Sequence, residues 1–564
     1  MEAAAFSFPL SSGLGSDVCE MTIPSARLRP LTVGLASANP CWLSLMESEG
    51  LAWQPVSDAH GPDAPPELII MPWETDTATR RLCSRLAAQG STLISELRQP
   101  QTQPVSQTQS LHFPYHREDF SGLPRADLPE AVRVEHARCG QGTCYVLPFR
   151  LDRLWPSARV GKKVVVVDAE QDTRVWHRQA WVVKKNVRRV VMDVLRQAMF
   201  SRHLPVVHKW YWPGKNRSVF CLRADLDSGP HENLARYLDA VHPWARSASV
   251  FVCVGRCLDK ADLIRKAAQA GLEVGSHTYS HMVFPDGLTN RRDATRAGRF
   301  LQAQGVEPAG LVAPAHFWHA SMYAPLVAHG FRYASCFGLD HDNLPYYPVV
   351  KGRLQTILEI PSHCLGDFFP KFRIPLDGEA GRRFFDRLIA KKHAAAEPLH
   401  LYGHADMDGR LGAAPALVRF LCERALALPD VWTGHLADLA SWWERRQKAV
   451  VHPWFDPARK RLVCETGATS AAMRDAPMLS VHLPDGSWRL VSIGACRPDG
   501  LDVYSVPARA PLQPPGATAV GEVTRSEEHP SLKDRVRARR VAFKRLAKAY
   551  VNIYLRQSEA GSTA

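Results

Sequence analysis

The sequence lacks three features that would set it apart from ordinary globular proteins. It has no run of about 18 or more apolar residues, so we expect no membrane-spanning helix. Its first residues contain no basic stretch followed by a long apolar core, so we expect no secretory signal. The 13 cysteines are an odd number without paired C-x-x-C spacings, which argues against a disulfide framework or a cysteine zinc site. These absences predict a cytoplasmic protein with reduced thiols.

The composition is that of a multidomain globular protein with an excess of positive charge. Of 564 residues, 45% are hydrophobic and 22% are charged, and this length exceeds what one hydrophobic core accommodates. The 70 basic residues outnumber the 56 acidic ones, which gives a formal net charge of +14. Such an excess favours a polyanionic neighbour.

Much of this charge lies near the C-terminus. Between Lys533 and Arg556 there are nine Lys or Arg residues and one acid, Asp534, and apolar residues recur at helical spacing. We expect a basic amphipathic helix over residues 531–557. It would either lie on an anionic membrane surface or dock its apolar stripe on the protein itself with the basic face in water. Nucleic-acid binding is not expected, because no zinc, RNA-recognition or helix-turn-helix pattern accompanies the charge.

Three short polar segments follow strand-like stretches in the middle of the chain. Arg223-Ala-Asp225-Leu-Asp227 ends an apolar run, Ser276-His277-Thr-Tyr-Ser-His281 follows Leu272-Glu-Val-Gly, and His404 follows Leu399-His-Leu-Tyr-Gly. Catalytic groups collect at strand ends in sheets with crossover helices. One carboxylate and two histidines can form a metal site, and a further carboxylate and histidine can act as base and acid, which suits metal-assisted hydrolysis.

The spacing of the histidines alone is not decisive, because three pairs stand four residues apart: His112/His116, His277/His281 and His400/His404. The carboxylates are more informative. Residues 223, 225 and 227 alternate along a strand, so their side chains share one face. Either they form a buried site, or the strand lies at the surface with Arg223 in a solvated ion pair.

These motifs resemble the polysaccharide deacetylase (NodB-homology) domain of carbohydrate esterase family 4, over about residues 215–445. Asp225-Leu-Asp227-Ser-Gly229 resembles a variant of its first motif and His277-Thr-Tyr-Ser-His281 its second. Gly310-Leu-Val-Ala-Pro314 stands where the third motif is expected, and Tyr402-Gly-His404 where the last one is. The resemblance implies Asp225 as general base, His404 as acid, and Asp227, His277 and His281 as ligands of one divalent metal, zinc in first place with cobalt, nickel or iron as alternatives.

The chain departs from the family pattern at two places. Val312 stands near the position of the arginine that orients the catalytic aspartate, and Arg223 is our candidate to replace it, since it shares a strand face with Asp225. The partner of His404 stays open between Asp367, which follows Pro361-Ser-His-Cys-Leu-Gly, and Asp406, two residues after His404. A backbone N–H in the Pro314-Ala-His316 turn is the expected donor to the oxyanion.

The fold class predicted for the whole chain is α/β. Alternating strands and helices from Leu31 to Glu96 indicate a flavodoxin-like parallel sheet, which resembles class I glutamine-amidotransferase-like domains. No nucleophile cysteine follows a strand there, so we expect a scaffold role. The expected parts are a loose N-terminus (1–28), this domain (29–200), a distorted (β/α) barrel of NodB type (205–448), a small β-sandwich-like module (449–507), a linker (508–530) and the basic helix (531–557).

The resemblance implies removal of an N-acyl group, acetyl or formyl, from an amino sugar. With no secretory signal, a lipid- or nucleotide-linked precursor in envelope glycan synthesis fits better than a secreted polymer, and the basic helix would bring the enzyme to the inner membrane face. Two alternatives stay open: a non-sugar amide substrate, or a catalytically reduced module that binds or assembles glycans.

Overall fold

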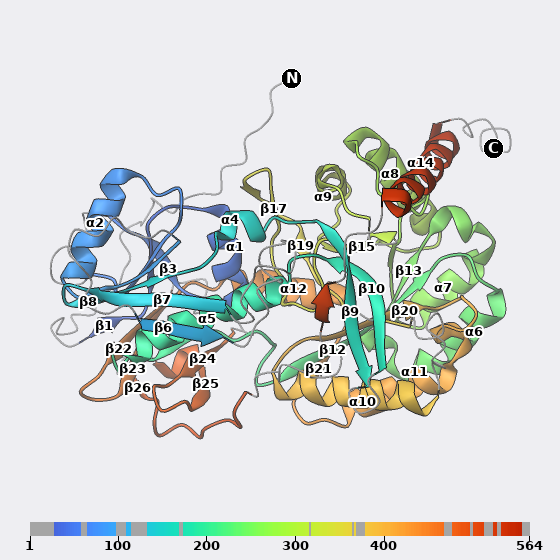
Figure 1. Cartoon of the computed structure of the whole chain (residues 1–564). Coiled ribbons are helices and arrows are strands. Elements are labelled where there is room, and N and C mark those ends of the chain that lie inside the picture. Colours follow the sequence, from blue (N-terminus) through green and yellow to red (C-terminus); the bar gives the residue numbers. More distant parts are fainter. Residues whose placement is uncertain are drawn as a thin grey trace.

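The computed structural model describes most of the chain, and Figure 1 shows it as two adjoining bodies, each built around a sheet. The N-terminal body contains a seven-stranded sheet, and the second body contains the barrel. None of the described helices combines the length and hydrophobicity needed to cross a membrane. The described residues are 28–57, 65–96, 109–113, 132–168, 173–314, 317–363, 366–367, 378–466, 477–496, 500–512, 523–526 and 532–554.

The N-terminal sheet has the order β3-β2-β4-β5-β8-β7-β6, and its first five strands run parallel. Its central strands β4 and β5 are buried along their whole length, as expected of parallel strands covered on both faces. Asn39 and Asp76 cap the two helices that follow β2 and β4. The elements are β2 (Val33–Leu35), α1 (Pro40–Glu49), β3 (Trp53–Pro55), β4 (Leu68–Met71), α2 (Thr77–Ala88), β5 (Thr92–Ser95), β6 (Gln109–Phe113), β7 (Val132–Cys139), β8 (Gly142–Val146) and α4 (Leu151–Leu154).

The basic amphipathic pattern of residues 179–200 predicts a helix there, but in the structure the helix begins later, at Lys184. Residues 173–180 form β10 (Thr173–Ala180), which pairs with β9 (Val160–Asp168), and α5 (Lys184–Phe200) follows. The difference arises because β9 and β10 form a long hairpin whose pairing overrides the helical periodicity of the residues before Lys184. β27 (Val523–Ser526), within the expected linker, pairs with β9.

The C-terminal strands do not form a module of their own, contrary to the expectation for residues 449–507. β22 (Val451–Asp456) pairs with β1 (Arg29–Pro30), and β24 (Met478–His482) pairs with β11 (Val206–Lys209). Residues of these strands share one hydrophobic core with the N-terminal sheet. Strands from early and late parts of the chain thus form two small antiparallel sheets together, β1-β22-β23-β26 and β11-β24-β25. The remaining strands are β23 (Arg461–Thr466), β25 (Trp488–Ser492) and β26 (Leu501–Asp502).

The central barrel is a parallel sheet of eight strands, which confirms the predicted α/β class. Its order is β19-β16-β15-β14-β13-β12-β20, and β21 also pairs with β12. The segment after β19 reaches β20 through a bond from His363 N to His400 O (2.8 Å), so the sheet curls toward closure. The strands are β12 (Ser218–Leu226), β13 (Ala248–Val252), β14 (Glu273–Ser276), β15 (Gly310–Val312), β16 (Tyr333–Ser335), β19 (Leu358–Glu359), β20 (Leu399–His404) and β21 (Val431–Thr433).

The strand that carries the first motif is buried along its whole length. Leu222, Ala224 and Leu226 of β12 join the core beneath the surrounding helices, so Arg223 and Asp225 face the barrel interior. The alternative of a surface strand is therefore wrong. The covering helices are α6 (His231–Val241), α7 (Ala261–Gln269), α8 (Gly287–Ala303), α9 (Tyr323–Ala328), α10 (Glu379–Ala394), α11 (Pro415–Leu426) and α12 (Leu436–Lys448).

The basic C-terminal helix forms as predicted, as α14 (Leu532–Tyr554), and lies against α8 (Figure 1). Ala549 and Ile553 are buried against Met282 and Phe284, and Tyr550 donates a hydrogen bond to Asp286. The apolar stripe therefore docks on the protein itself. Four cations of the helix are exposed: Arg540, Lys544, Arg545 and Lys548. Phe543 is also exposed, at 70% of its surface.

Candidate metal centre

Asp227, His277 and His281 meet at the carboxyl end of the barrel strands. The Asp227 Oδ1 atom lies 3.4 Å from His277 Nε2 and 3.2 Å from His281 Nε2. One ligand atom from each residue falls within 4.8 Å of the others, close enough to hold one metal ion. One carboxylate oxygen and two imidazole nitrogens suit zinc or a similar divalent metal and leave coordination positions open.

The ionisation of these groups also suits metal binding. Burial alone would raise the pKa of Asp227, but the two imidazoles hold it well below its usual range, so the carboxylate is charged. Burial lowers the pKa of His281, which keeps the imidazole neutral and able to donate its lone pair. Asp227 Oδ1 is buried without a conventional hydrogen-bond donor, as expected of an atom that serves a cation.

The loop that carries the two histidines has an unusual backbone held by a single carboxylate. Thr278 and His281 adopt left-handed φ angles of 67° and 59°. Asp293 of α8 accepts hydrogen bonds from Tyr279 N (2.8 Å) and Ser280 N (3.0 Å). These bonds offset the cost of the strained positions and fix where the ligands stand. No local sequence pattern singles out Asp293.

His277 is oriented by the third motif. Its Nδ1 lies 2.9 Å from the carbonyl oxygen of Val312, so Nδ1 carries the proton and Nε2 faces the metal position. The side chain of Val312 is fully buried in the barrel core. Position 312 therefore serves the site through its backbone. Ala315 and His316, where we expected the oxyanion donor, lie outside the described residues.

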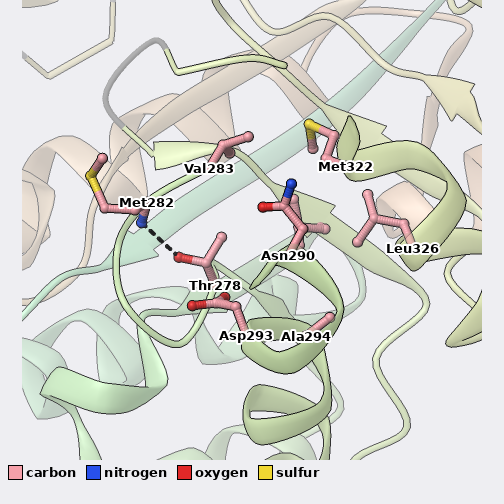
Figure 2. Close-up of a pocket in the computed structure, with 9 residues that line it drawn as sticks. Thr278, Met282, Val283, Asn290, Asp293, Ala294, Met322 and Leu326 are labelled. Carbon is pink, nitrogen blue, oxygen red and sulfur yellow. Dashed lines mark hydrogen bonds between the residues drawn. The ribbon is translucent and has the colours of Figure 1, made fainter. Parts of the chain in front are cut away.

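Behind the loop lies a small cavity, shown in Figure 2, between α8, β15 and α9. Thr278 reaches toward Met282, whose backbone N–H donates to Thr278 Oγ1 over 3.2 Å. His277 and His281 do not line the cavity, and its other walls are mostly apolar. The cavity is therefore part of the support for the loop.

Arg223 binds Asp225 in the barrel interior. Its Nε and Nη2 atoms each donate to one carboxylate oxygen over 2.8 Å, and Nη1 donates to Ser335 Oγ over 3.1 Å. Asp225 Oδ2 lies 3.9 Å from His277 Nε2, beside the metal ligands. Burial would raise the pKa of Asp225, but Arg223 and His277 hold it below its usual value, so the carboxylate is charged.

His404 contacts Asp367, which settles the geometry that the sequence left open. His404 Nδ1 lies 2.9 Å from Asp367 Oδ1, and Asp367 Oδ2 accepts from His404 N over 2.6 Å. Burial alone would lower the pKa of His404, but Asp367 together with the nearby Asp227 and Asp225 raises it to about 9. The imidazole is therefore protonated at neutral pH.

Asp406, the other candidate partner, contacts a different part of the site. Its carboxylate accepts backbone hydrogen bonds from Asp227 (3.1 Å), Ser228 (2.8 Å) and Gly229. Residue 229 must be glycine there, because a Cβ atom would lie 1.7 Å from Asp406 O. Asp406 thus holds the loop that presents Asp227, and placing it beside His404 was wrong.

His400, four residues before His404, is fully buried below the site. Its Nδ1 lies 3.2 Å from Pro361 O, and burial lowers its pKa to about 3. These contacts are those of a buried packing residue. Ser335, which accepts a hydrogen bond from Arg223, belongs to the site although no motif in the sequence indicates it.

Comparisons with known proteins found one family model and several solved structures similar to part of the chain. Residues 221–333 match the family model for polysaccharide deacetylase. No curated protein sequence matches the chain. One similar solved structure is described as a polysaccharide deacetylase from Mycobacterium smegmatis. It is 23% identical, and the match covers 42% of this chain and 93% of that one with a TM-score of 0.36.

Two further solved structures are similar. PuuE allantoinase is 18% identical over 42% of this chain and 92% of its own, with a TM-score of 0.35. A family 4 carbohydrate esterase from Streptomyces lividans in complex with acetate is 14% identical over 39% and 93%, with a TM-score of 0.27. The resemblance of the N-terminal domain to glutamine-amidotransferase-like domains stays a prediction. The family match confirms the resemblance seen in the motifs: residues 221–333 belong to a polysaccharide deacetylase domain, a hydrolase domain that acts on amide bonds.

Proposed function

We propose that this protein is a metal-dependent hydrolase that removes an N-acyl group, acetyl or formyl, from an amino sugar. The observation that carries the proposal is the approach of Asp227, His277 and His281 to within 4.8 Å of one another, beside a charged Asp225 and a protonated His404. A divalent ion held by these ligands supplies Lewis acidity and lowers the pKa of water. The substrate that fits best is a lipid- or nucleotide-linked precursor of an envelope glycan.

The residues of the chain divide the proton transfers between them. Asp225 is ionised and takes a proton from the attacking water, and Arg223 fixes the direction of its carboxylate by a bidentate contact. His404 gives a proton to the departing amine, which is a poor leaving group without it. Asp367 orients His404 and keeps it protonated.

We also propose that α14 brings the enzyme to an anionic membrane surface at the cytoplasmic face. Its docked side buries Ala549 and Ile553, while Lys544, Arg545 and Lys548 remain exposed beside the large aromatic side chain of Phe543. Cations attract anionic headgroups, and an exposed aromatic ring can enter the interface. Through Met282 and Phe284 the helix packs next to the metal-binding loop, so the active site would lie near the bound membrane.

The proposed reaction is tested by separating metal binding from chemistry. Asp227→Asn removes a ligand, so we expect loss of both bound metal and acetate release from an N-acetylated amino sugar. Asp225→Asn keeps all three ligands and removes the base, so we expect metal content to stay while the rate falls by about 100-fold or more. Elemental analysis and an acetate assay measure the two effects. Wild-type protein that binds metal yet releases acyl groups from no N-acyl sugar would point to a glycan-binding module, and release from a non-sugar amide would identify the other alternative.

Arg223→Ala is expected to lower the rate about 100-fold with little change in metal content. The reason is that Asp225 loses the contacts that fix its carboxylate, while the metal ligands keep theirs. Arg223→Lys is the matched control for charge, because it keeps a cation without the bidentate geometry and should recover only part of the rate. A wild-type rate in Arg223→Ala would show that Arg223 has no positioning role.

The rate should depend on the protonation of His404. Since the pKa of His404 is raised to about 9, the acid form is present below that pH and is lost as the pH rises through it. Asp367→Asn removes the charge that raises this pKa, so the basic limb of the pH–rate profile should move about one pH unit or more toward acid. The profile is measured at saturating metal. An unmoved basic limb would mean that another group supplies the proton.

Membrane binding is tested with vesicles of phosphatidylglycerol and phosphatidylcholine. Replacing Lys544, Arg545 and Lys548 by Glu should reduce binding to the anionic vesicles by more than about 100-fold, because each cation contributes roughly 1 kcal/mol near such a surface. In the control variant, three other exposed cations are each replaced by Glu. They are Arg265 and Lys266 on α7 and Arg419 on α11. If both variants lost vesicle binding equally, the loss would be due to net charge alone, and this would contradict a specific role of α14.

A further inference from the structure

A tight turn after β13 is joined to the loop that carries the metal-binding histidines. The turn comprises Val254–Arg256. Val254 N donates to Thr278 O over 3.1 Å, and Gly255 N donates to Tyr279 O over 2.9 Å. A side chain at position 255 would bring a Cβ atom to 2.6 Å from Tyr279 O, so the two backbones can approach this closely only with glycine. The backbone of Arg256 therefore has a fixed place beside the loop that carries His277 and His281.

The guanidinium of Arg256 is exposed and has no charged partner among the described residues. The nearest acid along the chain, Asp259, is already paired, because its carboxylate lies 3.0 Å from His231 Nε2 and 3.6 Å from Lys260 Nζ. The turn that carries Arg256 also packs against α8, the helix whose Asp293 holds the loop of His277 and His281. An arginine in this position contributes little to the stability of the fold.

The surroundings of the turn add positive charge. Arg296 of α8 stacks over the Tyr279 ring at 5.5 Å and donates to Asn552 O of α14. The exposed cations of α14 continue beyond it. A rim of this kind, beside an electrophilic metal, attracts a substrate that carries negative charge of its own.

We propose that Arg256 is a specificity-determining residue that binds an oxyanion on the amino-sugar substrate. The inference rests on the proposed function and narrows its substrate to sugars that bear a phosphate or a carboxylate. The planar guanidinium offers two parallel N–H donors to either group, which a neutral sugar cannot use.

The same strand supplies a matched control. Arg246 precedes β13 and Arg256 follows it, so the two arginines lie at opposite ends of the strand, and only Arg256 is at the catalytic end. Both are exposed, and Arg246 likewise has no charged partner among the described residues. Arg246→Gln therefore removes the same charge from the surface without touching the rim.

The experiment compares acetate release from N-acetylglucosamine 1-phosphate, N-acetylmuramic acid and neutral N-acetylglucosamine. Arg256→Gln should raise KM about tenfold for the charged sugars, the loss typical of one charge-assisted hydrogen bond, and leave kcat and the neutral sugar nearly unchanged. The charged sugar that shows the larger effect identifies the oxyanion as phosphate or carboxylate. Arg246→Gln should leave every KM unchanged. An equal rise of KM for charged and neutral sugars, or none, would overturn the proposal.

A binding measurement keeps this test independent of the reaction. Calorimetry on the metal-loaded wild type and Arg256→Gln gives the affinity for each sugar whether or not acetate is released. Tighter binding of a charged sugar by the wild type, with no acetate release, would support Arg256 while rejecting the deacetylase proposal. Equal affinities in the two proteins would reject the role of Arg256 itself.

Discussion

The buried pair of Arg223 and Asp225 is the constraint on which the rest of the site depends. Taking two charges into the barrel interior costs free energy. The cost is offset because Arg223 binds both carboxylate oxygens of Asp225 and donates an N–H group of Nη1 to Ser335. Both residues stand on β12, two positions apart, so the geometry follows from the strand itself. Asp225 is therefore paired without an arginine from β15, and the backbone of Val312 contacts His277 instead. The pairing of Asp225 with Arg223 thus explains why position 312 can be a valine.

Three other carboxylates act on the backbone of the loops that present the reacting groups. Asp406 binds the N–H groups of Asp227 to Gly229, Asp293 binds those of Tyr279 and Ser280, and Asp367 binds that of His404. A carboxylate accepts several such bonds at once, which fixes a loop more firmly than a neutral side chain does. Each loop with a chemical role therefore has its own buried anchor. Since each anchor comes from another element, the site is rigid only when the whole barrel is folded.

The sequence predicts what depends on neighbours in the chain. The candidate metal ligands are indicated by short motifs that resemble those of a known family, and the parallel strands of the N-terminal sheet are indicated by short apolar runs. It does not predict contacts made at a distance. Asp406 stands two residues from His404 but points to another loop, whereas Asp367 reaches it from 37 residues away. The sequence also does not predict that β22 pairs with β1 and β24 with β11. Turn residues indicate where a hairpin reverses direction, but they do not indicate which strand pairs with its outer side.

The excess of positive charge has two separate uses, which composition cannot distinguish. Part of it is consumed inside the molecule, on α5: Lys185 pairs with Asp342, Arg188 pairs with Glu49, and Lys184 donates to Leu339 O. The contacts of Lys184 and Lys185 join α5 to the loop after β16, and the pair of Arg188 and Glu49 joins α5 to α1. Water cannot screen these buried contacts as it does surface charges. They add nothing to the field seen by a partner. The charge that can attract an anion is what stays exposed, and on α14 it lies on a helix that packs against Met282 and Phe284, next to the loop of His277 and His281.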